Sequence, residues 1–111
     1  MTVTPPSGPQ GTTFNIGVQF QIYNQTGAGE IAIDINPPNA EPFGDGELVP
    51  DGYTPGVFQL SFTLQATPNE NEPFSPGTYQ AQIAICEGMC FSNHPNSAVL
   101  AQDSVNFQIT N

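Results

Sequence analysis

The sequence contains neither lysine nor arginine, and this absence limits both the fold and the choice of partners. Ten carboxylates and no basic side chain other than one histidine give a formal net charge of −10 at pH 7. Salt bridges therefore have almost no cations to use, and stability must come from apolar burial and backbone hydrogen bonds. Phosphate binding depends on lysine and arginine, so we expect no nucleic-acid partner and no attraction to anionic membranes.

Tryptophan and long apolar runs are absent as well. No stretch approaches the roughly 18 apolar residues that cross a bilayer, so the sequence predicts no membrane insertion. A signal-peptide h-region is also missing, which fits either a small protein made without secretion or a domain cut from a secreted parent. Charged residues are only 9% of the chain, far below the roughly 25% of average domains. Gln, Asn, Thr and Ser supply the polar surface, a composition common on extracellular and virion surfaces.

What the sequence does contain is a repeated alternation of apolar and polar residues. The longest example is Thr13–Tyr23. A β-strand turns successive side chains to opposite faces, so this pattern predicts a strand with one buried face. Similar alternation covers residues 30–36, 57–67, 78–86 and 104–110, and residues 39–56 form a long connection with a short strand near 47–49. Residues 96–102 fit either a helical turn or the start of the last strand, and we favour the strand.

These segments predict an all-β protein built as an antiparallel β-sandwich of about seven strands. Eleven glycines and twelve prolines make long helices unfavourable. A chain of 111 residues fits one domain, which we place at residues 1–111. Both sheets must turn an apolar face inward. The predicted core consists of the inward residues Phe14, Ile16, Val18, Phe20, Ile22, Ile33, Phe58, Leu60, Phe62, Leu64, Tyr79, Ile83, Ile85 and Phe107.

The order and spacing of these strands resembles an immunoglobulin-like domain of the bacterial surface or phage structural type. In this comparison Thr13–Tyr23 is strand B, and the segments 30–36, 57–67, 78–86 and 104–110 are strands C, E, F and G. The run Pro76–Tyr79 looks like the turn into strand F, which implies that the Tyr79 hydroxyl bonds to upstream backbone. The sequence departs from antibody domains because Val18 and Ala81 stand where inter-sheet cysteines would be expected.

Cys86 and Cys90 are the only cysteines. In an extended chain, four residues separate two Cα atoms by about 13 Å, whereas a disulfide needs roughly 4.4–6.8 Å. A bond therefore requires a turn, which Gly88 permits, and we predict a Cys86–Cys90 disulfide that stiffens the loop after strand F. Two free thiols are the main alternative. A copper site with Met89 and His94 is disfavoured, because such sites need a second histidine.

An acidic segment offers the other candidate site. Asp45, Glu47 and Asp51 lie close together among glycines, and carboxylates on a flexible loop suit calcium. The spacing of an EF-hand is absent, however, and Asp and Gly also collect in surface loops because they favour turns. We therefore treat these three residues as weak calcium candidates and favour a solvated acidic loop. The sequence predicts no cofactor and no catalytic residue, since His94 has no evident orienting partner.

The sequence therefore favours a non-enzymatic role carried by loops and outer faces. Our first hypothesis is a structural or assembly protein on a virion surface, of the phage capsid decoration or cement type. The alternative is an immunoglobulin-like module of a bacterial extracellular surface protein, adhesin or filament, and the third hypothesis is a carbohydrate-binding module. These hypotheses imply protein partners, through self-assembly or a capsid or surface protein, with a glycan as a further ligand. They place the domain on a virion surface or outside the cell.

One short motif points to a modification. Asn24-Gln25-Thr26 fits the acceptor pattern for N-glycosylation. The triplet lies in the predicted turn that follows Thr13–Tyr23. The same pattern also arises often by chance.

Overall fold

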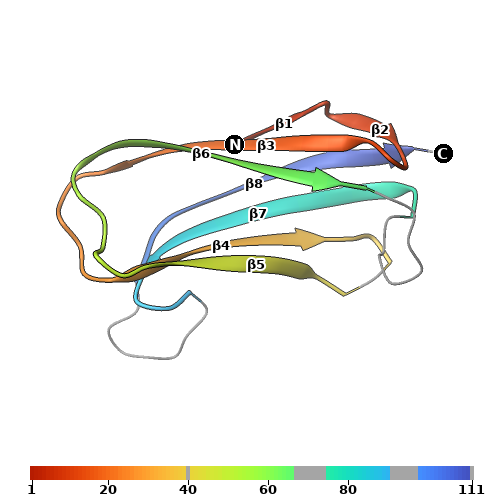
Figure 1. Ribbon diagram of the computed structural model, residues 1–111. Coiled ribbons are helices and arrows are strands. Elements are labelled where there is room, and N and C mark those ends of the chain that lie inside the picture. The colour runs from red at the N-terminus through yellow and green to blue at the C-terminus, as the bar shows by residue number, and fades with distance from the viewer. Residues whose placement is uncertain (40, 67–74, 91–97, 111) are drawn as a thin grey trace.

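The computed structural model describes residues 1–39, 41–66, 75–90 and 98–110. These residues form strands and no helix, so the prediction of an all-β fold is confirmed (Figure 1). The described part of the chain therefore offers no helix with the length and hydrophobicity that crossing a membrane requires. In chain order the strands are β1 (Thr2–Thr4), β2 (Ser7–Pro9), β3 (Thr13–Ile22), β4 (Gly29–Asn36), β5 (Phe43–Val49), β6 (Gly56–Gln65), β7 (Gly77–Glu87) and β8 (Ala98–Thr110).

The strands form two sheets that pack face to face (Figure 1). The smaller sheet has the order β1-β3-β6, and the larger has the order β2-β8-β7-β4-β5. In an immunoglobulin-like sandwich, β3 and β6 take the places of strands B and E, and β4, β7 and β8 take those of C, F and G. The pairings in the described residues are antiparallel except for β2 with β8, which is parallel. The predicted sandwich is thus confirmed, with one parallel edge that the sequence pattern did not indicate.

The N-terminal segment is divided between the two sheets. β1 pairs with β3, whereas β2 pairs with β8. Pro5 and Pro6 lie between them, and the Thr4–Pro5 peptide bond is cis. Proline has no N–H to donate to a ladder, so a proline pair suits the point where the chain leaves one sheet and enters the other. The first nine residues are therefore tied to both layers.

β3 is the central strand of the smaller sheet. It pairs with β6 from Thr13, opposite Gln65, to Ile22, opposite Gly56, and it pairs with β1 over residues 15–17. The residues between its buried positions are exposed or half-buried. The alternation that dominates the sequence therefore reflects a strand with one face against the core. That face consists of Phe14, Ile16, Val18, Phe20 and Ile22.

Buried side chains from both sheets form two main clusters. In the first, the Phe107 ring lies 4.8 Å from the Phe14 ring and 5.5 Å from the Tyr79 ring, measured between centroids. In the second, the Phe20 ring meets the Tyr53 ring edge-on at 6.4 Å. Aromatic pairs of this kind add about 0.5–1.5 kcal/mol beyond their area burial. The predicted core residues that lie buried are Phe14, Ile16, Val18, Phe20, Ile22, Tyr79, Ile83, Ile85 and Phe107.

Tyr79 makes the backbone bond that the resemblance implied. Its hydroxyl donates a hydrogen bond to the carbonyl oxygen of Ser75 at 2.7 Å. The side chain is buried, and this burial raises the pKa of the Tyr79 hydroxyl above its usual value of 10.0. Because the hydroxyl reaches a partner in the preceding turn, a polar group can end inside the sandwich without being left unsatisfied.

β6 shows the same alternation as β3 but buries its apolar face only in part. Phe58, Leu60, Phe62 and Leu64 are all half-buried, and Ile33 on β4 is half-buried as well. The reason is the position of β6: β3 lies between two strands, whereas β6 is the last strand of its sheet. The side of the sandwich between β5 and β6, which we call the open side, therefore leaves part of the core accessible.

The difference between β3 and β6 can be tested by substitution. Replacing buried Phe20 with alanine is expected to lower the free energy of unfolding by about 3–5 kcal/mol, because a well-packed site cannot collapse around the cavity. Replacing half-buried Phe62 with alanine should cost clearly less, since water already reaches part of that ring. Urea unfolding of the two variants measures both values, and equal losses would contradict the assignment of an open side.

Candidate interaction surface

The open side is a hollow lined mostly by apolar side chains. Its volume is about 310 Å³, and Ile33, Ile35 and Phe43 from the larger sheet face Phe62 and Leu64 from β6 across it. β5 and β6 are each the last strand of a sheet. Among the described strands neither has a neighbour beyond it, so the outer edge of each can accept a further strand through its backbone groups. An apolar hollow beside free strand edges is suited to an extended segment that adds to a sheet.

β5 places two carboxylates on the side that faces this hollow. Asp45 stands opposite Ile33 and Glu47 opposite Ile31 in the pairing of β5 with β4. Ile31 is buried between the sheets, and directly paired residues share one face of a sheet. Asp45 and Glu47 therefore point toward the inter-sheet side although they are exposed, while the two ends of β5 are half-buried and apolar.

Carboxylates in this position have a structural explanation and a functional one. Inward-pointing charges on an edge strand prevent two such edges from pairing with each other. A second copy of this chain would bring the same carboxylates and no lysine or arginine to neutralise them. A segment with basic side chains would instead bring opposite charge to both carboxylates. The open side can therefore discriminate between partners by charge.

The disulfide lies at the end of the sandwich where β7 finishes. Cys86 and Cys90 are bonded, with their Cα atoms 5.5 Å apart. Gly88 has a φ of 75°, a left-handed conformation that glycine adopts without strain and that turns the chain back on itself. Cys90 then packs in a buried cluster with Ala32 and Ala84 on the outer face of the larger sheet. These alanines leave the room that Cys90 fills.

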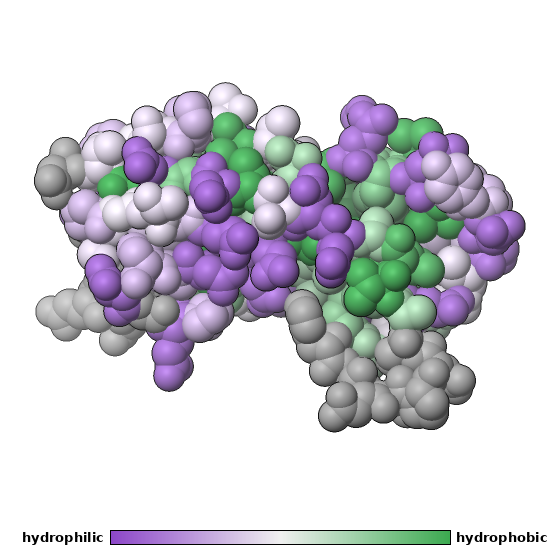
Figure 2. Space-filling view, turned by 180° about the vertical axis from the view of Figure 1, so that it is seen from behind, coloured by the Kyte–Doolittle hydropathy of each residue, from purple (hydrophilic) through white to green (hydrophobic). Residues whose placement is uncertain are grey.

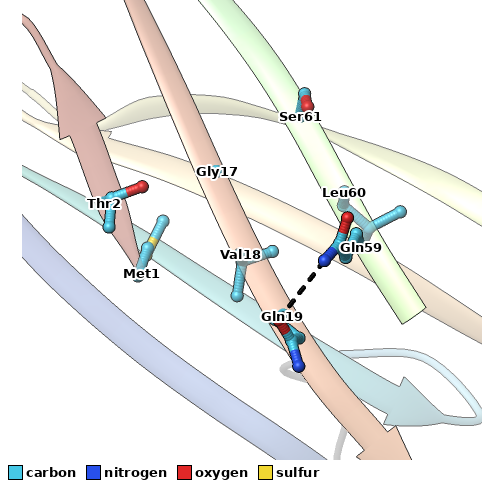
Figure 3. A pocket seen from close by; sticks show the side chains of 8 residues that line it. All are labelled: Met1, Thr2, Gly17, Val18, Gln19, Gln59, Leu60 and Ser61. Carbon is cyan, nitrogen blue, oxygen red and sulfur yellow. Dashed lines mark hydrogen bonds between the residues drawn. The ribbon is translucent and has the colours of Figure 1, made fainter. Parts of the chain in front are cut away.

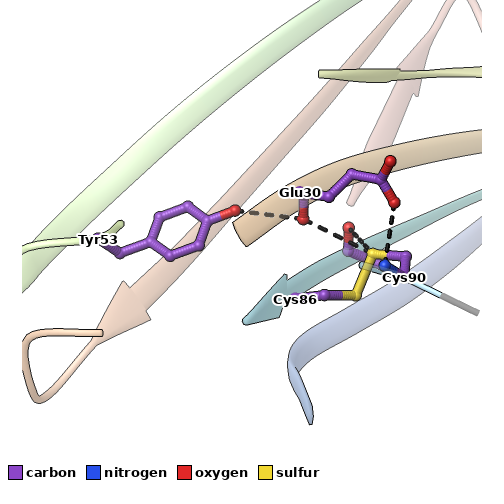
Figure 4. Close-up of a disulfide and its surroundings, with 5 residues drawn as sticks. Glu30, Tyr53, Cys86 and Cys90 are labelled. Atoms are coloured by element: carbon purple, nitrogen blue, oxygen red, sulfur yellow. Dashed lines mark hydrogen bonds between the residues drawn. A yellow bond between two sulfur atoms is a disulfide. The ribbon is translucent and has the colours of Figure 1, made fainter. Parts of the chain in front are cut away.

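Glu30 connects the disulfide loop to Tyr53. Its Oε1 accepts a hydrogen bond from the backbone N–H of Cys90 at 3.0 Å, and its carbonyl oxygen accepts one from the Tyr53 hydroxyl at 3.2 Å (Figure 4). Burial first, and then the charges of Glu30 and Glu47, raise the pKa of Tyr53 above its usual value of 10.0. The backbone N–H of Tyr53 also donates to Thr26 Oγ1 at 2.9 Å. Tyr53, in the connection between β5 and β6, is thus bonded to Thr26 in the connection between β3 and β4, and through Glu30 it is linked to the disulfide loop after β7.

The same end of the molecule exposes apolar side chains, and we call it the apolar end. Figure 2 shows several hydrophobic areas on the half of the molecule that finishes there. A second hollow of about 310 Å³ lies between Ala28, Leu48, Pro50 and Met89, and Leu48 is 66% exposed. Apolar side chains that gather at the surface make this end a second candidate contact area. The exposed large hydrophobic residues are Tyr23, Leu48, Val57, Met89, Val99 and Leu100.

A third hollow lies along β3 and differs from the others in its lining. Its volume is about 300 Å³, and Thr2 lies on one side of it with residues Gln59–Ser61 on the other (Figure 3). Gly17 leaves the space open because it has no side chain, and Gln59 Nε2 donates a hydrogen bond to Gln19 Oε1 at 3.3 Å. β1, β3 and β6 contain no charged residue. The carboxylates of the described chain therefore belong to the larger sheet and its connections, and none of the side chains that line this hollow is charged.

The weak calcium candidates are not gathered into a metal site. Asp45 and Glu47 lie on β5 and Asp51 lies in the turn that follows. Within residues 1–39, 41–66, 75–90 and 98–110, no three acidic, cysteine or histidine side chains lie close enough to hold an ion. Asp45 Oδ1 instead accepts the backbone N–H of Gly46 at 2.8 Å. His94, considered for copper binding and for catalysis, lies outside the described residues.

The sequence-based reasoning missed the features that make the open side a candidate site. It predicted a short strand only near residues 47–49 and took the acidic segment as a flexible loop, because Gly44 and Gly46 interrupt the apolar alternation of β5, which in fact begins at Phe43. It also placed Phe62 in the core with no distinction from residues on β3. One available signal was the short connection between β5, which ends at Val49, and β6, which begins at Gly56. A connection of this length has no room for another strand that could pair with the outer edge of β6.

Comparison with known proteins identifies the family. The profile of the Countin C-terminal domain matches residues 1–111. The chain belongs to this family. Countin-3 of Dictyostelium discoideum is 42% identical over 109 residues, which cover 98% of this chain and 49% of countin-3. Countin-2 of the same organism is 41% identical over 109 residues, which cover 97% of this chain and 42% of countin-2. The chain thus spans about half the length of the curated relatives it matches, and no solved structure matches it.

Membership of the countin family corrects the sequence-based hypotheses about lineage and role. The resemblance to the bacterial surface or phage structural type was wrong, because the matching family and relatives are countins. The virion-surface role as a capsid decoration or cement protein is overturned by the same finding. The bacterial adhesin or filament module and the carbohydrate-binding module lose their support as well. The misleading features were the sandwich pattern and the uncharged polar surface, which unrelated families with different functions share.

The contribution of the disulfide is testable by removing both sulfurs. The Cys86→Ser and Cys90→Ser double variant should lose about 2 kcal/mol of unfolding free energy, the value that chain entropy gives for so short a loop. Urea unfolding measures the loss, and the unmodified chain in a reducing agent serves as the matched control. The contribution assigned to the disulfide is refuted if neither comparison shows a decrease.

Tyr53 should make stability fall in alkaline solution. Its pKa lies above 10.0 in the folded chain, so the unfolded chain loses this proton first as the pH rises through about 10. The free energy of unfolding is then unaffected below that pH and decreases above it. Urea unfolding at about pH 9 and about pH 11 tests this, and Tyr53→Phe should show a smaller decrease than the unmodified chain. Equal decreases would mean that Tyr53 is not the group responsible.

Proposed function

We propose that this domain is an extracellular, non-enzymatic module through which a countin-type protein binds a basic, extended segment of a protein partner. The observation that carries the proposal is the open side, where Asp45 lines an apolar hollow between β5 and β6 and Glu47 shares the same face of β5. A segment that pairs with β5 gains main-chain hydrogen bonds along the edge. Its alternate side chains then lie over the hollow, where basic ones meet the carboxylates and apolar ones meet Phe43 and Phe62.

The charge of the whole chain favours the same class of partner. With a formal charge of −10, the domain attracts basic segments from a distance and repels copies of itself. Charge complementarity of this kind contributes mainly to the rate and the specificity of association. The apolar side chains of the open side would supply the remaining affinity by burial. The proposed partner is therefore an extended protein segment whose hollow-facing side, made of every second residue, carries both basic and apolar side chains.

The disulfide supports a location outside the cell. Disulfides form and persist in oxidising compartments, and they are rare in the reducing cytosol. The Cys86–Cys90 bond closes a short loop and fixes Cys90 against the outer face of the larger sheet. A domain that uses a disulfide in this structural way suits a secreted or surface-exposed protein.

The lining of the open side supports a binding role and not a catalytic one. Asp45 and Thr63 are the polar side chains among the residues that line it. A nucleophile needs a neighbouring base that a third group orients. Asp45 instead accepts a hydrogen bond from the backbone of Gly46, and Thr63 stands opposite Asn15 in the smaller sheet. This set can orient a bound strand but does not supply such an arrangement.

A defined peptide tests the proposal. We expect a short synthetic peptide, Val-Thr-Lys-Thr-Lys-Thr-Val, whose alternate residues match Phe43, Asp45, Glu47 and Val49 in order, to shift the backbone NMR signals of β5 and β6 in the isotope-labelled chain. The Asp45→Asn and Glu47→Gln double variant should bind about tenfold more weakly, because two rim ion pairs of up to about 1 kcal/mol each are lost. Added salt should weaken binding to the unmodified chain more than binding to this variant.

Two controls make the result specific. The same peptide with both lysines replaced by glutamate should not bind, because it repeats the charge of β5. Asp103→Asn removes the same charge from β8, which β7 and β4 separate from β5, and it should leave the affinity almost unchanged. Shifts confined to the apolar end, or equal weakening by all the charge variants, would show that the open side is not the binding site.

A further inference from the structure

Asn24 stands at an accessible position on the apolar end. It is the second residue after β3, in the connection to β4, and its side chain is exposed. Its neighbours Tyr23 and Gln25 are exposed as well. This connection lies at the opposite end of β3 from Phe14, near the turns that end β5 and β7 (Figure 1). A bulky group on Asn24 would therefore extend into solvent without disturbing the core.

The residues of the acceptor triplet have different structural roles. The Thr26 hydroxyl has a role in the fold: its Oγ1 accepts a hydrogen bond from the N–H of Tyr53 at 2.9 Å and donates one to the Gly27 carbonyl at 3.1 Å. The Asn24 side chain makes no hydrogen bond within the described residues, so the fold gives no reason for asparagine at this position. An exposed asparagine without a structural role, two residues before a threonine, meets the chemical requirement for N-glycosylation.

The surroundings of Asn24 give a glycan a surface to cover. Ala28, from the same connection, lines the hollow that Leu48 and Met89 also line. Tyr23, next to Asn24, is 76% exposed. The connection is held against the end of β7, because Gly27 N–H donates to Glu87 at 2.6 Å and Gly88 N–H donates to the Ala28 carbonyl at 2.9 Å. The connection that carries Asn24 is therefore held next to these apolar side chains.

We propose that Asn24 is N-glycosylated and that the glycan covers the apolar end of the domain. The donor is an oligosaccharide linked through its first carbon to a lipid diphosphate. The Asn24 amide nitrogen forms a bond to that carbon and loses one proton, while the bond from carbon to the diphosphate oxygen breaks and the lipid diphosphate leaves. The modification adds a polar, bulky group at an exposed site. The apolar end is thereby shielded, and the open side stays free for its partner.

This proposal goes beyond the partner-binding role and does not depend on it. The two share only the passage through an oxidising compartment, where the Cys86–Cys90 disulfide forms. Peptide binding to the open side can fail while Asn24 carries a glycan, and the reverse is equally possible. The measurements for the two proposals are also independent, since one reads NMR shifts and the other reads a mass.

To test the proposal, the full chain is expressed in Dictyostelium cells with a cleavable signal peptide at its N-terminus, and the secreted chain is purified from the medium. Intact-mass measurement should show a glycan on the unmodified chain, and an amidase that converts the glycosylated asparagine to aspartate should remove it. Asn24→Gln should abolish the added mass. Thr26→Ser keeps both the acceptor pattern and the hydroxyl that bonds Tyr53, so it should retain the glycan. Asn15→Gln, on an exposed asparagine with glycine two residues later, should also retain it.

The outcomes decide the two parts of the proposal separately. If the secreted chain contains the Cys86–Cys90 disulfide but no glycan on Asn24, the glycosylation proposal is overturned, because a chain with the disulfide has passed through the oxidising compartment where the modification occurs. Added mass that persists in Asn24→Gln overturns it as well. For the covering role, chain treated with the amidase should bind more of a fluorescent apolar dye than glycosylated chain. Equal dye binding by the two forms would refute the covering role.

Discussion

The buried face of β3 is the feature on which the rest of the structure depends. It contributes Phe14 and Ile16 to one core cluster and Val18, Phe20 and Ile22 to the other, so a single strand joins both halves of the core. Few other interactions could replace it, because the described part of the chain has one ion pair, between the terminal ammonium of Met1 and exposed Asp103. The free energy gained by burying the five apolar side chains of β3 is therefore a large share of the small net stability of the domain.

This dependence separates the parts of the molecule that carry stability from those that are free for recognition. β3 lies between two strands, and its inward residues are buried. The open side lies at the edge of each sheet, and the apolar end lies where the strands finish. Apolar side chains there have fewer neighbours and remain accessible. Recognition and shielding are thus proposed at the two places where the sandwich leaves its own core incompletely covered.

The fold could be predicted from the sequence because its strongest signal is local. Alternation over residues 13–22, 56–65 and 77–87 fixes which side chains face inward, and the strands follow from that. The open side could not be predicted in the same way, because exposure of Phe62 depends on which strand ends each sheet. The role of Asp45 and Glu47 was hidden by glycines in β5. The family lay beyond pattern reasoning, since alternation reports a fold that many lineages share.

The division of the N-terminal segment between two sheets has a mechanical consequence. β2 and β8 are parallel neighbours, with Ser7 opposite Gln108 and Pro9 opposite Thr110, and the Gln108 N–H donates to the Pro6 carbonyl at 3.0 Å. Tension applied to the chain before β2 and after β8 pulls these strands along their length in opposite directions. Their hydrogen bonds are then loaded together in shear, instead of being opened one at a time. The short parallel edge is therefore placed where the domain resists a stretching force.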